Sequence, residues 1–176
     1  MKQQEATNNQ SMKQITVLLA EDQTSLRKSL KWLVELDGDI KVIGEAKNGR
    51  EAVRLAMNLR PDVIVMDIAM PLLNGLQATL QIMETSPATR VLILSAHPDP
   101  AYIEQAMLYG ASGYLMKQSS TQVLAQAVRD VQSGNSHFSK SISKQLRDQC
   151  RKVFGKGEAL KKKTARLALA AGAAKN

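Results

Sequence analysis

The stretch Pro61-Asp62-Val63-Ile64-Val65-Met66-Asp67 decides the fold, because a short apolar run ends abruptly in a carboxylate. An apolar run of this length is typical of a strand that is buried on both faces of a parallel sheet. The side chain of Asp67 is therefore expected at the carboxyl end of a strand, which is where open α/β sheets bind their ligands.

On both sides of this stretch, strand-like and helix-like segments alternate five times. Strands are predicted over residues 15–20, 40–45, 62–66, 91–94 and 112–116. One helix is predicted to follow Thr24 as a cap and to end near residue 36, and others to cover residues 50–58 and 99–110. Two more are predicted, one from the loop through Asn74-Gly75 to about residue 85 and one from a cap at Ser119 or Ser120 to about residue 133. Five such units predict an α/β fold, a flavodoxin-like, doubly wound five-stranded parallel sheet in the order 2-1-3-4-5.

The charge of the chain is distributed unevenly. The net charge is +8, but residues 15–137 hold 11 basic and 13 acidic side chains, whereas residues 138–176 hold 11 basic and 2 acidic ones. This asymmetry predicts three parts. They are a disordered leader over residues 1–14, a domain over residues 15–137, and a basic helical tail or truncated linker over residues 138–176.

Composition excludes several classes of protein. No apolar stretch approaches the length that spans a bilayer, so no membrane partner is expected. The polar residues 1–14 do not form a secretory signal. The single cysteine, Cys150, allows no internal disulfide, which fits a reducing compartment. A cytoplasmic location is therefore predicted.

Polar side chains follow four of the predicted strands. Glu21 and Asp22 follow the first strand, Asp67 ends the third, Ser95 the fourth and Lys117 the fifth. Because these strand ends share one edge of a parallel sheet, the side chains are expected to converge. Three close carboxylates repel one another unless a cation is present, and all-oxygen ligands indicate Mg²⁺. The pattern predicts a metal-assisted phosphoryl site with Asp67 as the nucleophile.

Taken singly, each of these side chains also has a structural explanation. Asp67 can cap a turn, and the Glu21-Asp22 pair can interact with the positive end of the following helix. Ser95 can be a turn residue and Lys117 a solvated surface residue. Only the joint pattern favours a reactive site.

An enzyme is the alternative class that must be considered. Dehalogenase-like phosphatases also carry an aspartate at a strand end, but they need a second acid two residues later, where this chain has Ala69. The chain also has no Walker loop and no dinucleotide-binding glycine motif. A metabolic enzyme is therefore disfavoured.

Four short motifs lie in this order along the chain. They are Leu18-Leu19-Ala20-Glu21-Asp22, Val65 to Pro71 with Asn74-Gly75, Leu94-Ser95-Ala96, and Gly113-Tyr114-Leu115-Met116-Lys117. With these motifs the chain resembles the receiver domain of bacterial two-component response regulators. The last motif, with Ser119 before a helix, is similar to the NarL/LuxR-type subfamily, although the remaining residues are too few for its C-terminal helix-turn-helix.

The resemblance implies a role for each acidic residue. Asp67 would accept a phosphoryl group from a histidine kinase. Asp22 would bind Mg²⁺ directly and Glu21 through a water molecule, while Asp67 and the backbone carbonyl of Ala69 would complete the protein ligands of the metal.

The same resemblance implies a switch. Ser95 and Lys117 would hold the phosphoryl oxygens, and Ser95 would move on phosphorylation. Tyr114 would rotate inward behind it and change the surface of the fourth helix, fifth strand and fifth helix, originally to control transcription. The structural alternative for Tyr114 is a core aromatic residue with a solvated hydroxyl.

The tail permits two outputs. Apolar residues Ile142, Leu146, Cys150 and Val153 share one helical stripe, which could dock on the domain or pair with a second copy in a homodimer. Lys161-Lys162-Lys163 follows it and could make weak contacts with DNA phosphates, unless it belongs to a plain linker. The function is therefore expected to be that of a phosphorylated switch, with a nucleic-acid-binding protein acting through its tail as the alternative.

Overall fold

A computed structural model of the chain describes residues 14–96, 99–119, 121–142, 144, 146–148, 150 and 152. Its strands are β1 (Ile15–Ala20), β2 (Ile40–Ala46), β3 (Val63–Asp67), β4 (Arg90–Ser95), β5 (Gly113–Met116) and β6 (His137–Phe138). Its helices are α1 (Thr24–Glu35), α2 (Gly49–Leu59), α3 (Gly75–Thr85), α4 (Pro100–Leu108) and α5 (Thr121–Gln132). The predicted leader before residue 14, and Val153 with the rest of the basic tail, lie outside the described residues.

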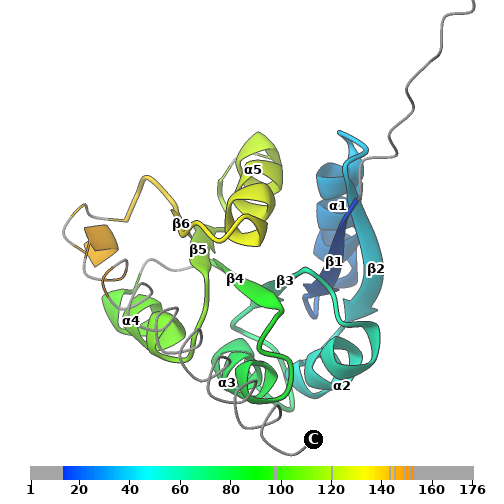
Figure 1. The fold of residues 1–176 in the computed structure, drawn as a ribbon, viewed down its shortest axis with the longest axis horizontal. Coiled ribbons are helices and arrows are strands. Elements are labelled where there is room, and N and C mark those ends of the chain that lie inside the picture. Colours follow the sequence, from blue (N-terminus) through cyan, green and yellow to red (C-terminus); the bar gives the residue numbers. More distant parts are fainter. Residues whose placement is uncertain are drawn as a thin grey trace, which may run out of the picture.

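The sheet is parallel throughout and has the order β2-β1-β3-β4-β5-β6. Helices α1 and α5 cover one face, and α2, α3 and α4 cover the other (Figure 1). The predicted doubly wound fold and strand order are confirmed, but the prediction of five strands is wrong. The sixth strand, β6, adds to the outer edge of β5 and pairs Phe138 with Tyr114. Two residues are too few to show a period of two in the sequence, so β6 left no detectable signal.

Buried residues of the central strands alternate between two hydrophobic clusters. In β3, Ile64 and Met66 belong to the cluster that contains buried residues of α2, α3 and α4, whereas Val63 and Val65 belong to the cluster of α1 and α5. Because helices cover both faces, all five residues of β3 are buried. The sheet is thus a rigid support for whatever lies at its carboxyl edge.

Side chains that cap helices fix three of the loops at that edge. Asn48 and Asn74 each accept a hydrogen bond, 2.9 Å long, from the amide three residues later, and so begin α2 and α3. Asp99 caps α4 by accepting from the amide of Ala101, two residues later, with Pro100 in the first turn. The prediction that Thr24 caps α1 is wrong, since Gln23 holds the N-cap position and its side chain makes no capping bond.

The chain continues to pack after β6. Ile142, Leu146 and Cys150 of the predicted apolar stripe are buried in the cluster that contains Ile103 and Met107 of α4. Positions 144, 146–148, 150 and 152 are helical. The stripe is therefore docked on the α4 side of the sheet. Within the described part of the chain, no helix is both long and apolar enough to cross a bilayer.

Candidate functional site

The register of the sheet brings the predicted site residues together. Ala20 of β1 pairs with Met66 of β3, so the residues that follow them, Glu21 and Asp67, are neighbours. Ser95 of β4 pairs with Met116 of β5, which is followed by Lys117. Hydrogen-bond register alone therefore places residues from four strands at one edge.

Three carboxylates lie at the centre of this edge. Glu21, Asp22 and Asp67 each offer an oxygen, and these oxygens lie within 4.8 Å of one another. Glu21 is 1% exposed and Asp67 is 3% exposed. Such close and buried negative charges must be compensated by a cation, and oxygen donors suit a hard divalent ion.

Lys117 supplies part of this compensation. Its Nζ lies 2.8 Å from Glu21 Oε2 and 3.1 Å from Asp67 Oδ1. Burial lowers the pKa of the Lys117 ammonium, but hydrogen bonds to Glu21 and Asp67 outweigh this effect, so the pKa is raised above its ordinary value. Lys117 is therefore a fixed positive charge between two carboxylates.

One ammonium does not satisfy the buried carboxylates fully. Burial raises the pKa of Glu21, the Lys117 hydrogen bond opposes this, and the neighbouring Asp67 charge raises it further; the net direction is upward. Apart from its ion pair with Lys117, Glu21 Oε2 has no hydrogen-bond partner among the described residues. One ammonium shared by two buried carboxylates, with Asp22 close by, leaves net negative charge, which fits a site that takes an additional cation.

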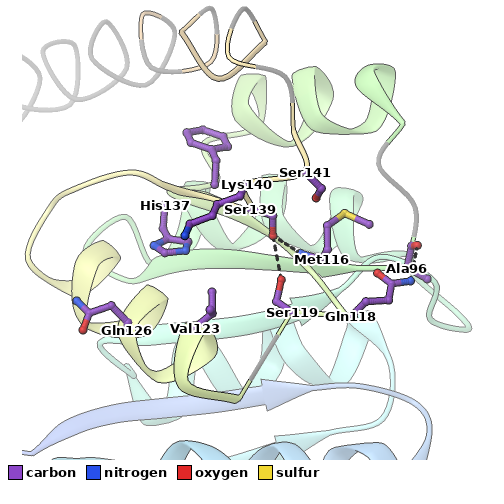
Figure 2. A pocket seen from close by; sticks show the side chains of 11 residues that line it. Ala96, Met116, Gln118, Ser119, Val123, Gln126, His137, Ser139, Lys140 and Ser141 are labelled. Carbon is purple, nitrogen blue, oxygen red and sulfur yellow. Dashed lines mark hydrogen bonds between the residues drawn. The ribbon is translucent and has the colours of Figure 1, made fainter.

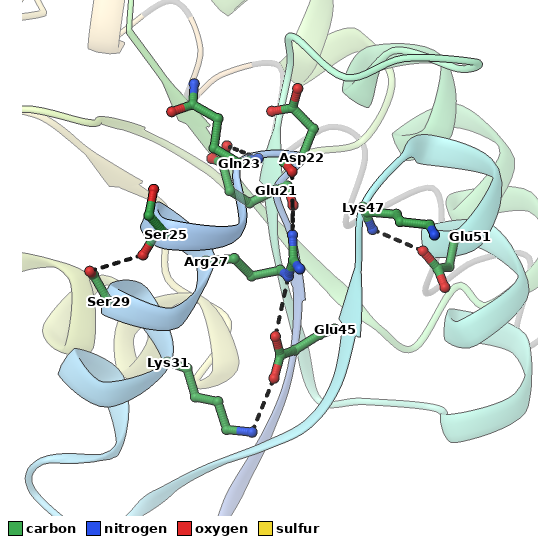
Figure 3. Close-up of polar contacts among 10 residues, drawn as sticks. All are labelled: Glu21, Asp22, Gln23, Ser25, Arg27, Ser29, Lys31, Glu45, Lys47 and Glu51. Atoms are coloured by element: carbon green, nitrogen blue, oxygen red, sulfur yellow. Dashed lines mark hydrogen bonds and ion pairs between the residues drawn. The ribbon is translucent and has the colours of Figure 1, made fainter.

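A basic side chain on α1 orients the acidic loop. Arg27 Nη1 donates a hydrogen bond of 2.6 Å to the backbone carbonyl of Glu21, and its Nε lies 3.2 Å from Glu45 Oε2 (Figure 3). Lys31 binds the other oxygen of Glu45 at 3.1 Å. Arg27 thus ties the acidic loop to β2. Arg27 was not predicted from the sequence. The only available signal was its position in the first turn of the helix that follows the acidic pair, and this position alone does not indicate a role.

The carboxylates open into a hollow of about 540 Å³. Asp22, Asp67, Ala69, Ser95 and Lys117, all of them candidate site residues of the sequence, are among the residues that line it. Its other lining residues include three side chains that sequence reasoning missed: Tyr102 and Gln105 of α4, and Tyr109, which caps the end of that helix. No motif marks them, because their approach depends on how α4 packs on the sheet.

Two predicted residues are buried and are not among those that line the hollow. Glu21 is nearly inaccessible to solvent, and Tyr114 is fully buried in the cluster on the α4 side. Burial raises the pKa of the Tyr114 phenol, and a hydrogen bond with Ser95 opposes this shift. Tyr114 therefore points inward, in contact with the hydroxyl at the end of β4.

A close backbone approach holds Asp67 from the other side. Gly75 begins α3, and its N–H donates to the carbonyl of Ile68 at 2.9 Å. A Cβ at this position would lie 2.0 Å from the carbonyl oxygen of Asp67. Only glycine fits here, so Gly75 has a steric role that the turn signal Asn74-Gly75 did not reveal.

Comparison with known proteins agrees with this geometry. Residues 17–129 match the response regulator receiver domain, so the chain belongs to this family. It is 31% identical to the transcriptional regulatory protein DegU of Brevibacillus brevis, over 82% of this chain and 61% of that protein. It is 37% identical to the transcriptional regulatory protein LnrK of Bacillus subtilis, over 75% of this chain and 60% of that protein.

A solved structure supports the same assignment. A two-component response regulator of the LuxR family from Aurantimonas sp. SI85-9A1 superposes with a TM-score of 0.73 at 31% identity, covering 77% of this chain and 97% of that one. The predicted resemblance to the NarL/LuxR group is confirmed. The chain spans about 60% of the length of the first two curated relatives. Receiver domains of this family are regulatory phosphoacceptors that interact with histidine kinases and can dimerise.

Proposed function

We propose that this chain is the receiver of a two-component phosphorelay and that Asp67 accepts a phosphoryl group from a histidine kinase. The observation that carries the proposal is the placement of Asp67 beside the Lys117 ammonium, within a cluster of three carboxylates at the carboxyl edge of the sheet. A buried carboxylate that only stabilised the fold would not need two further acids at this distance.

The residues present fit Mg²⁺, which in this site would neutralise charge on the phosphoryl oxygens. Asp22, Asp67 and the backbone carbonyl of Ala69 would hold it directly, and Glu21 would act through a water molecule. Supporting observations are the all-oxygen donor set and the presence of three carboxylates around the single Lys117 ammonium. Removal of any of these acids should weaken Mg²⁺ binding.

The transfer itself relies on three side chains of this chain and forms one new bond. A carboxylate oxygen of Asp67 attacks phosphorus, and the bond to the histidine nitrogen breaks, with its electron pair leaving on the imidazole. Lys117 and Ser95 bind the phosphoryl oxygens and orient them for attack. We expect the Tyr114 ring, through its contact with Ser95, to report this change to the surface formed by α4, β5 and α5.

In this role the chain is a switch and not a metabolic enzyme. Its partners would be a histidine kinase and, as one option, a second copy of the chain. The curated relatives described above are named as transcriptional regulators, so control of transcription from the cytoplasm is the output that we propose for the whole protein.

Acetyl phosphate tests the proposal without a kinase. Intact-mass spectrometry should detect one phosphoryl group on the native protein in the presence of Mg²⁺, and none after Mg²⁺ is removed with EDTA. The Asp67→Asn variant should take up none. Asp37→Asn, which removes an exposed carboxylate paired with Arg129, is the matched control and should behave like the native chain. Equal uptake by Asp67→Asn and the native protein would reject the proposal.

A further inference from the structure

Ser139 is a buried polar residue that lies ten positions beyond the part of the chain that matches the family. Its N–H donates to the carbonyl of Tyr114 at 3.1 Å. Its Oγ accepts from the N–H of Met116 at 2.8 Å and lies 3.1 Å from Ser119 Oγ (Figure 2). The backbone amide and the hydroxyl of Ser139 thus continue the hydrogen bonding along the edge of β5 beyond the end of β6.

These bonds lie next to the proposed phosphoryl site. Met116 directly precedes Lys117, whose ammonium bridges Glu21 and Asp67. The N–H of Lys117 in turn donates to the carbonyl of Ser95 at 2.8 Å. Ser139 therefore binds the backbone of the switch tyrosine and of the residue before the site lysine. Loss of its hydroxyl would leave the buried Met116 N–H without this partner.

In the other direction, Ser139 begins the docked C-terminal segment, defined here as the described residues 139–142, 144, 146–148 and 150. Its carbonyl accepts from the N–H of Ile142 at 3.1 Å. Ile142, Leu146 and Cys150 are buried in the cluster on the α4 side. The guanidinium of Arg147 donates to the backbone carbonyls of Lys140 and Ile142, which closes the turn between Ser139 and the helical positions.

We propose that Ser139 is a positioning residue that couples the Asp67 site to docking of this C-terminal segment, and that a phosphoryl group on Asp67 loosens the segment. The proposal rests on the function proposed above. A phosphoryl group draws Lys117 away from Glu21, because its oxygens carry more negative charge than a carboxylate. The backbone at Met116 and Lys117 then shifts, and the geometry that the Ser139 hydroxyl requires is lost.

The coupling must be reciprocal. If a ligand at Asp67 weakens docking, then weakened docking must strengthen binding of that ligand by the same factor. Beryllium fluoride, a reversible mimic of the phosphoryl group, allows this equality to be measured with Mg²⁺ present. Typical couplings of this kind correspond to roughly 5-fold to 150-fold changes in affinity.

Cys150 provides the probe for docking. It is the only cysteine in the sequence, it is 2% exposed, and burial raises the pKa of its thiol. Its labelling by an aromatic disulfide therefore requires the segment to open. We expect beryllium fluoride with Mg²⁺ to accelerate labelling of the native protein about fivefold or more. The Asp67→Asn variant should label slowly with or without it.

Variants at Ser139 separate positioning from simple packing. Ser139→Ala should label rapidly without beryllium fluoride and should bind it, measured by titration calorimetry, about fivefold or more tightly than the native protein. Ser139→Thr keeps the hydroxyl and should restore both native values. Leu146→Ala loosens the segment from its far end and should also tighten binding, which keeps the test valid if Ser139→Ala folds poorly.

Two outcomes overturn the proposal. One is that Ser139→Ala and Leu146→Ala release Cys150 while the affinity for beryllium fluoride stays native, because the contact is then merely structural. The other is that the native protein binds beryllium fluoride with no change in labelling. In both cases phosphorylation of Asp67 can still be intact, so the proposed function stands. A protein that neither binds beryllium fluoride nor takes up a phosphoryl group overturns both ideas.

Discussion

At the scale of single residues, the site combines features that the sequence can and cannot predict. Strand periodicity and a parallel sheet suffice to bring Glu21, Asp67 and Lys117 to one edge, because the register of neighbouring strands is nearly fixed. The sequence does not predict that Lys117 pairs with both acids. This pairing is seen only in the structure, where the Lys117 ammonium lies 2.8 Å from Glu21 and 3.1 Å from Asp67. The sequence also did not predict that Glu21 is almost completely buried.

The raised pKa of Glu21 has a measurable consequence. The folded protein binds a proton at Glu21 more tightly than the unfolded chain, so the free energy of unfolding falls as the pH rises from 4.5 toward the raised value. The slope across this interval is about 1.4 kcal/mol per pH unit. Glu21→Gln carries no charge, so we expect it to gain stability relative to the native protein as the pH rises, measured by urea unfolding in EDTA.

Glu45→Gln is the control of opposite sign. Hydrogen bonds from Lys31, and then from Arg27, lower the pKa of Glu45 despite its partial burial. Its contribution is therefore present above the ordinary value of 4.5 and is lost as the pH falls. As the pH rises, the free energy of unfolding of the native protein should therefore increase relative to that of the Glu45→Gln variant. A stability difference between Glu21→Gln and the native protein that does not change with pH would contradict the burial of a charged Glu21.

At the scale of elements, the loops between strands and helices hold the site in place. The existence of the five helices and five of the strands was predictable from periodicity and turn signals. The strand β6 and the steric role of Gly75 were not, because each depends on a contact made across the fold, and the start of α1 was misplaced because its N-cap residue, Gln23, makes no capping bond. Gly75 sits where α3 touches the backbone of Asp67.

Substitution of Gly75 tests this contact. In Gly75→Ala, the new Cβ meets the Asp67 carbonyl at 2.0 Å, so the backbone of α3 or β3 must move. We expect a loss of about 3 kcal/mol in urea unfolding, together with reduced phosphoryl uptake. Gly134→Ala is the control, since Gly134 has φ +87° but no atom within 4 Å. It should lose about 1–2 kcal/mol and keep native uptake. Equal effects on uptake would argue against a positioning role for Gly75.

At the scale of the whole molecule, the ends of the domain are tied together. Arg129 of α5 binds Asp39 through Nε at 2.7 Å and Asp37 through Nη2 at 2.6 Å, so the last helix of the family-matching region holds the loop between α1 and β2. The acidic partners, with Asp39 first, raise the pKa of Arg129. The docked C-terminal segment packs instead through apolar contacts, because Ile142, Leu146 and Cys150 are buried in the cluster that contains residues of α4.

The Arg129 link predicts a salt-dependent stability. Arg129→Met should lose about 1 kcal/mol at low ionic strength, and less at high salt, because screening weakens exposed ion pairs. Arg54→Met is the matched control: Arg54 is mostly exposed and lies 3.8 Å from Glu51, so its removal should change little. Equal stabilities of the two variants at low salt would show that the Arg129 link does not hold the domain.

The most direct test of the central claim is to identify the residue that carries the phosphoryl group. After treatment with acetyl phosphate and Mg²⁺, borohydride reduction converts an aspartyl phosphate to homoserine, which peptide mass spectrometry locates. We predict conversion at Asp67 alone, in a reaction that EDTA abolishes. Conversion at Asp22 or at any other carboxylate, with Asp67 unmodified, would contradict the assignment of Asp67 as the phosphoryl acceptor.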